Sequence, residues 1–150
     1  KPWVEGMDYR IRPAAPEDLP QVEGLLLEVG LPVEGVRENL ATFLVAEREG
    51  AVVGTAGLEI VGESALLRSV ASAPCARKRR MAEALVGRTL ELARSSGARS
   101  VFLLTETASA WFSRMGFEPV ARDAVPAALR YSSALEGICP MSSTCMELKR

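Results

Sequence analysis

The chain has 150 residues, enough for one domain with its own core; 48% of them are hydrophobic and 25% are charged. Its 18 basic and 19 acidic residues leave a net charge of −1, which argues against a protein that coats nucleic acid. The absence of histidine excludes Ser-His-Asp and Cys-His mechanisms and zinc sites that need imidazole. Acid–base chemistry therefore falls to carboxylates, Tyr, Cys, Lys, a terminal amine or water.

The cysteines and the hydropathy pattern indicate a reduced compartment. Three cysteines are an odd number in a chain without a secretory signal, and no apolar run reaches the ~18 residues of a membrane span. We therefore expect a cytoplasmic protein with small buried thiols and no membrane partner. Residues 1–6 (KPWVEG) precede Met7 and are interpreted as an added remnant, which leaves 7–150 as a single domain.

The first half of the chain predicts a strand, two helices and three further strands. Pro16-Glu17-Asp18 is a helix-start signal, and apolar residues follow it at helical spacing up to Gly30. The turn signals Glu49-Gly50 and Gly62-Glu63 separate the later strands. The expected elements are a strand at 9–12, helices at 16–30 and 33–40, and strands at 43–47, 52–60 and 65–73.

The second half predicts a helix, a strand, another helix and a tail that ends in a strand. Paired apolar residues from Met81 onward form an amphipathic helix that Gly97 terminates. The run SVFLLT (100–105) is a continuous apolar strand of the kind buried on both faces. The remaining elements are a helix at 108–115, a stretch at 117–120, a segment at 125–129 and a strand at 143–148.

This order of elements defines the expected fold class. Antiparallel hairpins come first, and a strand–helix–strand crossover follows them. We expect an α+β domain with a mixed, mostly antiparallel twisted sheet and helices on both faces.

The stretch APCARKRRMA (73–82) places four basic residues, Arg77 to Arg80, between a strand and a helix. A strand that runs directly into a helix exposes backbone N–H groups, which form an anion site together with the helix dipole. A phosphate or pyrophosphate is the expected guest, and basic side chains would add charge-assisted contacts. A solvated basic turn is the alternative interpretation.

Several motifs in this order resemble the GNAT superfamily of N-acetyltransferases. The stretch VASAPCARKRRMAEALVGRTLELA is similar to the acetyl-CoA motif of that family, with Arg77 at the first conserved position and Ala82 at the last. The hairpin FLVAEREGAVVGTAGLEI resembles the second and third strands of the family. LLTETASAWFSRMGFEPV resembles its later strand and helix, and the match covers about 9–120.

The resemblance implies acetyl-CoA as co-substrate, bound by the strand end and the helix start, and it implies no metal. The expected cofactor-binding residues are Val70, Ala71, Ser72, Arg77, Lys78, Arg79, Arg80, Met81 and Ala82. The segment 70–72 would pair with the pantetheine amides like an added strand. Lys78 and Arg80 stand where the family carries glycine, so their side chains either clamp the phosphates or obstruct the backbone.

The expected reaction is direct attack of an amine on the thioester, which needs a base and an oxyanion donor. Without histidine, a carboxylate is the expected base: Glu59 on the hairpin strand is the first choice, and Glu106 is the second. The resemblance suggests a backbone N–H near Val70 for the oxyanion. Phe112 stands where the family carries the Tyr that acts as general acid. The thiolate therefore either leaves without a proton donor or receives its proton from Ser113 or Tyr131.

Two arginines are candidates for binding the acceptor. Arg68, in LLRSV, either forms a bidentate pair with a substrate carboxylate or makes a structural salt bridge. Arg130 allows the same two interpretations. Trp111 and Phe112 are expected to pack in the core rather than stack on adenine.

The stretches LLRSVASAP, LLTETASAWFSRMGF, VPAALR and CPMSSTC resemble the arsenic-resistance N-acetyltransferase subfamily, which brings the tail into the match; members of this subfamily include acetyltransferases of toxic amino-acid analogues. The leading hypothesis is therefore an acetyl-CoA-dependent N-acetyltransferase of a small amine. The alternative is a non-catalytic CoA-binding module or a thiol-based arsenical-binding protein, although Cys139 and Cys145 are too few for a metal motif. Nucleic acid is not an expected partner, whereas pairing into a homodimer is compatible with this family.

Overall fold

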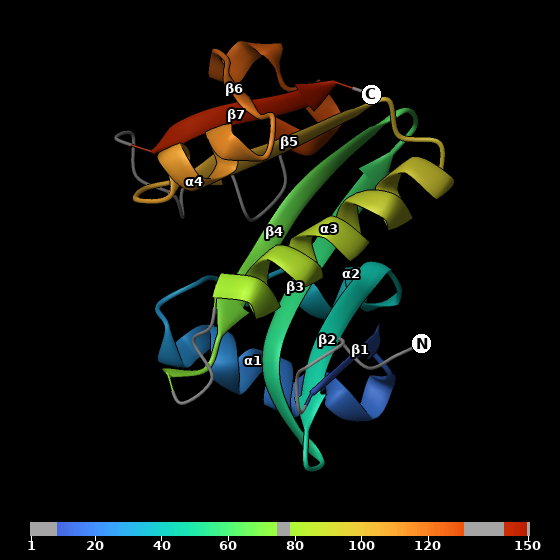
Figure 1. Ribbon diagram of the computed structural model, residues 1–150. Helices are drawn as coiled ribbons and strands as arrows, with labels where there is room; N and C mark the ends of the chain where they lie inside the picture. Colours follow the sequence, from blue (N-terminus) through green and yellow to red (C-terminus); the bar gives the residue numbers. More distant parts are fainter. Residues whose placement is uncertain (1–8, 75–78, 131–142, 150) are drawn as a thin grey trace.

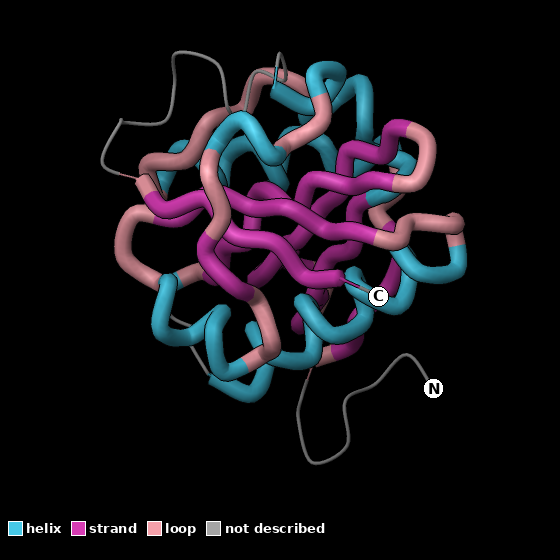
Figure 2. Tube along the Cα trace, turned by 90° about the horizontal axis from the view of Figure 1, so that it is seen from above, coloured by secondary structure: helices cyan, strands magenta, loops and turns pink. Residues whose placement is uncertain are grey.

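The computed structural model describes residues 9–74, 79–130 and 143–149. These residues form a seven-stranded sheet in the order β1-β2-β3-β4-β5-β7-β6. Figure 1 shows the elements in chain order, and Figure 2 shows helices on either side of the strands. Across the part of the chain that is described, no helix has the length and apolarity that a membrane crossing needs.

The first four strands form an antiparallel series. They are β1 (Arg10–Pro13), β2 (Phe43–Arg48), β3 (Ala51–Val61) and β4 (Ser64–Ser72). Glu49 and Gly50 connect β2 to β3 with φ angles of 51° and 81°. Two positive φ angles in a two-residue loop match the twist of the flanking strands, which is why this turn can be so short.

One face of the sheet is covered by the segment between β1 and β2. It contains η1 (Pro16–Asp18), α1 (Leu19–Glu28), α2 (Val36–Asn39) and η2 (Leu40–Thr42). The apolar side of this layer packs on alternate residues of β2, as the two-residue period of a strand requires. The buried side chains here are Val22, Leu25, Leu26, Val36, Leu40, Phe43, Val45 and Val52.

The opposite face is covered by α3 (Arg79–Ser95). Its buried residues recur every three or four positions, so one stripe of the helix meets the sheet. These residues are Met81, Leu85, Val86, Leu90 and Ala93. The helix ends at Ser95, Gly97 (φ 92°) turns the chain after it, and the N–H of Ala98 donates to the carbonyl of Ala93 at 3.0 Å.

The last third of the chain completes the sheet. Its elements are β5 (Ser100–Thr105), α4 (Ser109–Arg114), β6 (Glu118–Pro119), η4 (Arg122–Ala124), α5 (Ala127–Arg130) and β7 (Thr144–Lys149). Phe102 of β5 packs with Val125 and Leu129 on one face, whereas Val101 and Leu103 pack with α3 on the other. β5 is therefore buried on both faces, as its continuous apolar sequence predicts.

The pairing between β4 and β5 is short and opens the sheet. The two parallel strands are paired only from Ser64–Leu66 of β4 to Ser100–Phe102 of β5. After Leu66, β4 pairs with β3 alone among the described strands. On its other side, β5 pairs with β7 along its whole length. Figure 1 shows β4 and β5 meeting at the upper right and diverging toward the left.

The fold class predicted from the sequence is confirmed. The order of elements, the antiparallel start and the parallel crossover through α3 are all present. The predicted helix at 33–40 is shorter, because Gly35 has a φ of 84° and the helix begins only at Val36. The other boundaries shift by a few residues, and the predicted strand at 100–105 is found with those bounds.

Candidate functional site

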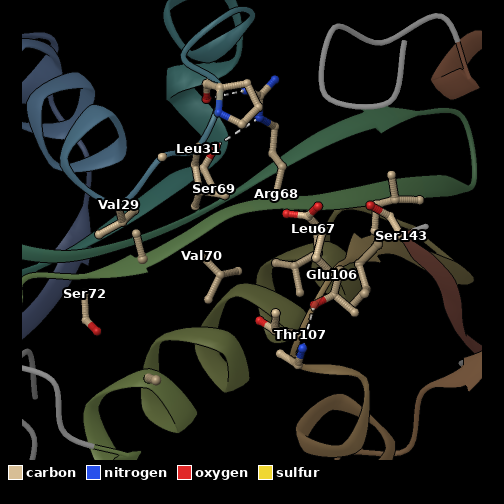
Figure 3. A pocket seen from close by; sticks show the side chains of 18 of the residues that line it. Val29, Leu31, Leu67, Arg68, Ser69, Val70, Ser72, Glu106, Thr107 and Ser143 are labelled. Carbon is tan, nitrogen blue, oxygen red and sulfur yellow. Dashed lines mark hydrogen bonds between the residues drawn. The ribbon is translucent and has the colours of Figure 1, made fainter. Parts of the chain in front are cut away.

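A cavity of about 840 Å³ lies where β4 and β5 diverge. Its walls come from the segment after α1, the second half of β4, the start of α3, the end of β5 with α4, and the residue before β7. Figure 3 labels residues of the segment after α1, of β4, of the chain that follows β5, and Ser143 around the same space. The lining residues include 27, 29–34, 67–72, 82, 85, 103–108, 111, 112 and 143.

The middle of β4 carries a β-bulge that faces this cavity. Thr55 of β3 pairs with Ala71, and Gly57 pairs with Arg68, so β4 holds one residue more than β3 between the two pairs. Ser69, inside the bulge, has a φ of 58°. Such a bulge bends the strand and turns its backbone groups, and it is typical of strands beside active sites.

Arg68 is buried beside the bulge and bonds to residues of three segments. It is 5% exposed, and its Nη1 donates to Glu59 Oε2 of β3 at 2.7 Å. Its Nε donates to Ser69 Oγ at 3.0 Å, and its Nη2 donates to the carbonyl of Pro32 at 3.4 Å. The structural salt bridge, one of the two interpretations of Arg68 from the sequence, is therefore present.

The two predicted catalytic carboxylates occupy different places. Glu106 follows β5 directly and lines the cavity, near the turn that Thr105 Oγ1 closes by accepting the N–H of Ala108 at 3.0 Å. Glu59 is not among the cavity-lining residues, and its side chain, 15% exposed, pairs with Arg68. Of the two candidates, Glu106 lines the cavity, whereas Glu59 lies behind it in a salt bridge with Arg68.

Ser143 lines the cavity from the residue before β7. The β5–β7 register pairs Thr105 with Thr144, which places Ser143 across from Glu106. Its Oγ is buried, and no hydrogen-bond partner for it is found in the described part of the chain. Sequence reasoning missed this residue, because only the pairing of the tail strand with β5 brings it to the cavity.

The α3 end of the cavity carries part of the predicted cofactor site. Val70, Ala71, Ser72 and Ala82 line the cavity. Met81 of α3 is 1% exposed, because its side chain packs between the helix and the sheet, so it can offer a ligand only its backbone. Arg80 is exposed, whereas Arg77, Lys78 and the side chain of Arg79 lie outside the described residues.

The two aromatic residues of α4 are packed as the sequence predicts. Phe112 is 7% exposed and belongs to the core, where its ring makes edge-to-face contacts with Trp111 and Phe117. Trp111 is partly buried against that core and lines the cavity. Ser113 is exposed and is not a lining residue, and Tyr131 lies outside the described residues.

The remaining predicted residues do not add to the described site. Arg130 ends α5, but its side chain is outside the described part. Cys145 is buried in β7, and burial raises the pKa of its thiol above the ordinary value. Cys139 lies outside the described residues, among which no group of three metal-ligating side chains is found.

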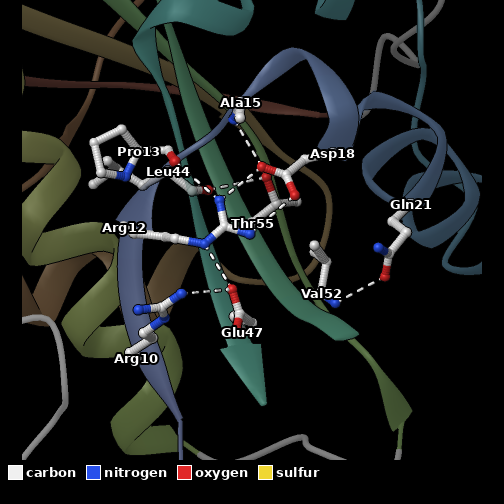
Figure 4. A network of polar contacts seen from close by, with 10 residues as sticks. All are labelled: Arg10, Arg12, Pro13, Ala15, Asp18, Gln21, Leu44, Glu47, Val52 and Thr55. Carbon is white, nitrogen blue, oxygen red and sulfur yellow. Dashed lines mark hydrogen bonds and ion pairs between the residues drawn. The ribbon is translucent and has the colours of Figure 1, made fainter. Parts of the chain in front are cut away.

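A second polar network, at the β1 edge, holds the start of α1 (Figure 4). Arg12 donates to both carboxylate oxygens of Asp18 at 2.7 and 3.0 Å and to Glu47 Oε1 at 2.7 Å. The hydrogen bonds to Arg12 hold the pKa of Asp18 and that of Glu47 below their usual range, and they raise the pKa of Arg12. This network supports the segment that forms one cavity wall.

Comparison with known families identifies the class of this domain. The family model described as "Acetyltransferase (GNAT) domain" matches residues 39–119, more than half of the chain. The chain therefore belongs to the GNAT acetyltransferase family, as its sequence motifs lead one to expect.

Among curated proteins, similar relatives are amino-acid acetyltransferases. The enzyme of Pseudomonas syringae pv. syringae is 33% identical over 127 residues, which cover 79% of this chain and 29% of the relative. The enzyme of Aeromonas salmonicida (strain A449) is 33% identical over 107 residues, covering 67% of this chain and 24% of the relative. The chain thus spans less than a third of the length of these relatives.

Solved structures share the fold over nearly the whole chain. N-acetylglutamate synthase from Neisseria gonorrhoeae, complexed with coenzyme A and N-acetyl-glutamate, has a TM-score of 0.81 at 23% identity, covering 97% of this chain and 36% of that one. Rv2747 from Mycobacterium tuberculosis, in complex with CoA, has a TM-score of 0.79 at 25% identity, covering 93% and 98%. Both similar structures contain CoA.

Proposed function

We propose that the protein transfers an acetyl group from acetyl-CoA to the amine of a small molecule by direct attack. The observation that carries this proposal is the cavity between the diverging strands, into which the bulged half of β4 faces. Family membership and CoA in two similar structures support the choice of acyl donor.

The proposed place for acetyl-CoA uses backbone groups on one side and helix α3 on the other. Val70, Ala71 and Ser72 line the cavity, and no described strand pairs with that edge of β4, so the backbone groups that point to this edge are available to pantetheine. The pyrophosphate would lie at the start of α3, where free N–H groups and the helix dipole favour an anion. The exposed position of Arg80 supports an outward side chain that clamps a phosphate rather than one that blocks the backbone.

The proposed chemistry needs one proton removed before attack and a donor for the oxyanion. A base takes a proton from the ammonium, and the neutral nitrogen then attacks the thioester carbonyl carbon. The backbone N–H near Val70, at the bulge, is the proposed donor to the developing oxyanion. Collapse breaks the carbon–sulfur bond, and the second nitrogen proton ends on the departing thiolate.

Of the two predicted bases, we assign the role to Glu106. It lines the cavity, whereas Glu59 is paired with a buried guanidinium at 2.7 Å and would have to leave that pair to accept a proton. The matched variants are E106Q and E59Q. We expect E106Q to lower kcat about 10²-fold or more. E59Q should lower kcat less than E106Q; a loss of kcat that is larger in E59Q than in E106Q would move the role to Glu59.

We propose an amino-acid-like acceptor, because the curated relatives are named amino-acid acetyltransferases. The tail motifs support the narrower proposal of a toxic amino-acid analogue related to arsenic resistance. The sequence allows Arg68 and Arg130 either to bind a carboxylate of such an acceptor or to make a structural salt bridge, and the salt bridge with Glu59 engages Arg68. The proposal includes a cytoplasmic location, supported by the odd number of cysteines, and a homodimer, which light scattering would test.

A thiol-release assay separates the enzyme from a non-catalytic module. Purified protein is incubated with acetyl-CoA and a panel of amino acids and amines, and free thiol is followed over time. Amine-dependent release that E106Q slows supports the proposed function. Saturable binding of acetyl-CoA without thiol release in the presence of any amine would favour a CoA-binding module instead. Phe112, buried in the core where the family carries a general-acid Tyr, supports this alternative.

A further inference from the structure

We propose that Arg68 is a positioning residue: it fixes the bulge of β4 and thereby aims the backbone N–H of Val70 into the cavity. This inference rests on the proposed function. It departs from a direct contact between Arg68 and the acceptor, and it assigns Glu59 the part of a counter-ion rather than a base.

The contacts of Arg68 join two walls of the cavity to the neighbouring strand β3. Glu59 belongs to β3, Ser69 to the bulge, and Pro32 to the segment that follows α1. Ser69 and Pro32 both line the cavity. One guanidinium therefore links the bulge to the segment after α1, and rigid walls are what a reaction with strict geometry needs.

The bulge needs this support because Ser69 is not a glycine. A φ of 58° brings the Cβ of an L-residue close to the following carbonyl, so this conformation persists only where surrounding contacts enforce it. Ser69 Oγ accepts the Nε–H of Arg68 at 3.0 Å, which fixes the side chain of the strained residue. Val70, the next residue, takes its direction from that backbone.

The same contacts make a role in gripping the acceptor unnecessary. The side chain of Arg68 is 3% exposed, so little of the guanidinium surface faces a ligand. A charge at that depth requires a nearby opposite charge, which Glu59 supplies from the adjacent strand. Three of its nitrogens already donate to protein oxygens.

The test first removes the Arg68–Glu59 ion pair and then, in a further variant, relieves the backbone strain at Ser69. R68M alone leaves the Glu59 carboxylate without this partner and risks misfolding, so R68M/E59Q removes both charges together. R68M/E59Q/S69G adds a glycine, which adopts a positive φ without help. R10M is the matched control, because Arg10 of β1 pairs with Glu47 of β2, and neither residue lines the cavity.

The first readout needs no acceptor: the amide resonances of residues 69 and 70 in the ligand-free protein. We expect R68M/E59Q to shift the Val70 resonance, S69G to return it toward the wild-type position, and R10M to leave it in place. An unchanged Val70 resonance in R68M/E59Q would overturn the inference. This readout is independent of whether wild-type protein releases thiol, so its failure is distinct from failure of the proposed function.

The second readout is the split between kcat and KM in the thiol-release assay. Positioning predicts that R68M/E59Q lowers kcat about tenfold or more, leaves KM for the amine within about threefold, and is largely rescued by S69G. The loss should be equal for an amino acid and for the amine that lacks its carboxylate. A raised KM only for the carboxylate-bearing acceptor, or a lack of rescue by S69G, would contradict positioning and restore Arg68 as a carboxylate-binding residue.

Discussion

Replacing Asp18 with alanine tests the network that anchors the helical wall of the cavity. The carboxylate of Asp18 accepts two hydrogen bonds from Arg12, at 2.7 and 3.0 Å, and one from the N–H of Ala15 at 2.7 Å. Asp18 is 6% exposed, so the lost bonds are not simply replaced by water. Arg12 keeps Glu47 as a partner, and the variant therefore leaves no isolated buried charge.

The expected loss follows from these bonds. The bond to the Ala15 N–H, at the start of the helical segment, contributes about 1 kcal/mol. A hydrogen-bonded charge pair contributes about 1.5–3 kcal/mol, and the two bonds from the partly exposed Arg12 are therefore taken together as about 2 kcal/mol. We expect D18A to lower the free energy of unfolding by about 3 kcal/mol, which corresponds to about 6–12 °C in Tm for a chain of this size.

The dependence on pH gives a second, independent sign. The pKa of Asp18 lies below its ordinary value in the folded state, chiefly because of the hydrogen bonds from Arg12. Its contribution is therefore fully present above the unfolded pKa of ~3.9 and is lost as the pH falls through the lower folded pKa. The difference between wild type and D18A should be constant from pH 7 to about pH 5 and should shrink below about pH 4.

Urea unfolding followed by circular dichroism measures both effects. The exposed neighbour Glu17 provides the matched control, and E17A should change the free energy of unfolding by less than about 0.5 kcal/mol. A D18A loss as small as that of E17A, or one that grows as the pH falls below 4, would refute the role given to this network.

Three further predictions concern single positions. A Cβ on Gly57 would overlap a buried aromatic ring, so G57A should lower the free energy of unfolding by about 1–3 kcal/mol, and an unchanged urea midpoint would contradict this. S143A removes a buried hydroxyl for which the described residues provide no partner, so stability should stay within about 0.5 kcal/mol or rise; a loss above about 1 kcal/mol would reveal a partner. In a C75S/C139S variant, the raised pKa of Cys145 predicts slow alkylation at pH 7 that accelerates on unfolding, whereas fast alkylation of native protein would refute its burial.

The sequence predicts the fold well because local patterns and global packing agree. The run 100–105 is apolar throughout, and its two faces pack under α3 and α5, so its strand has the predicted bounds. The short helix near 33–40 begins late because Gly35 adopts a positive φ, which helical spacing of apolar residues does not reveal. The order of the elements can thus be predicted from the sequence, whereas a boundary that depends on one backbone angle cannot.

The site can be predicted from the sequence only in part, because tertiary contacts define it. The edge 70–72 and Ala82, for which the motif predicts a role in cofactor binding, line the cavity. The bulge at Ser69 leaves no local signal, since no glycine marks its positive φ. Glu59 and Arg68 are nine positions apart, and only the β3–β4 register brings them together. Ser143 enters the cavity through pairing with β5, which the tail sequence alone does not specify.

Binding of acetyl-CoA between β4 and β5 is the claim on which the proposed function depends, and isothermal titration tests it most directly. Ala82 lines the cavity in the first turn of α3, where a glutamate suits the helix dipole but would repel the phosphates. Wild-type protein should give saturable heat, and A82E should bind at least about tenfold more weakly while its Tm is maintained. An absence of saturable heat in wild type, or equal affinity in A82E, would contradict the claim.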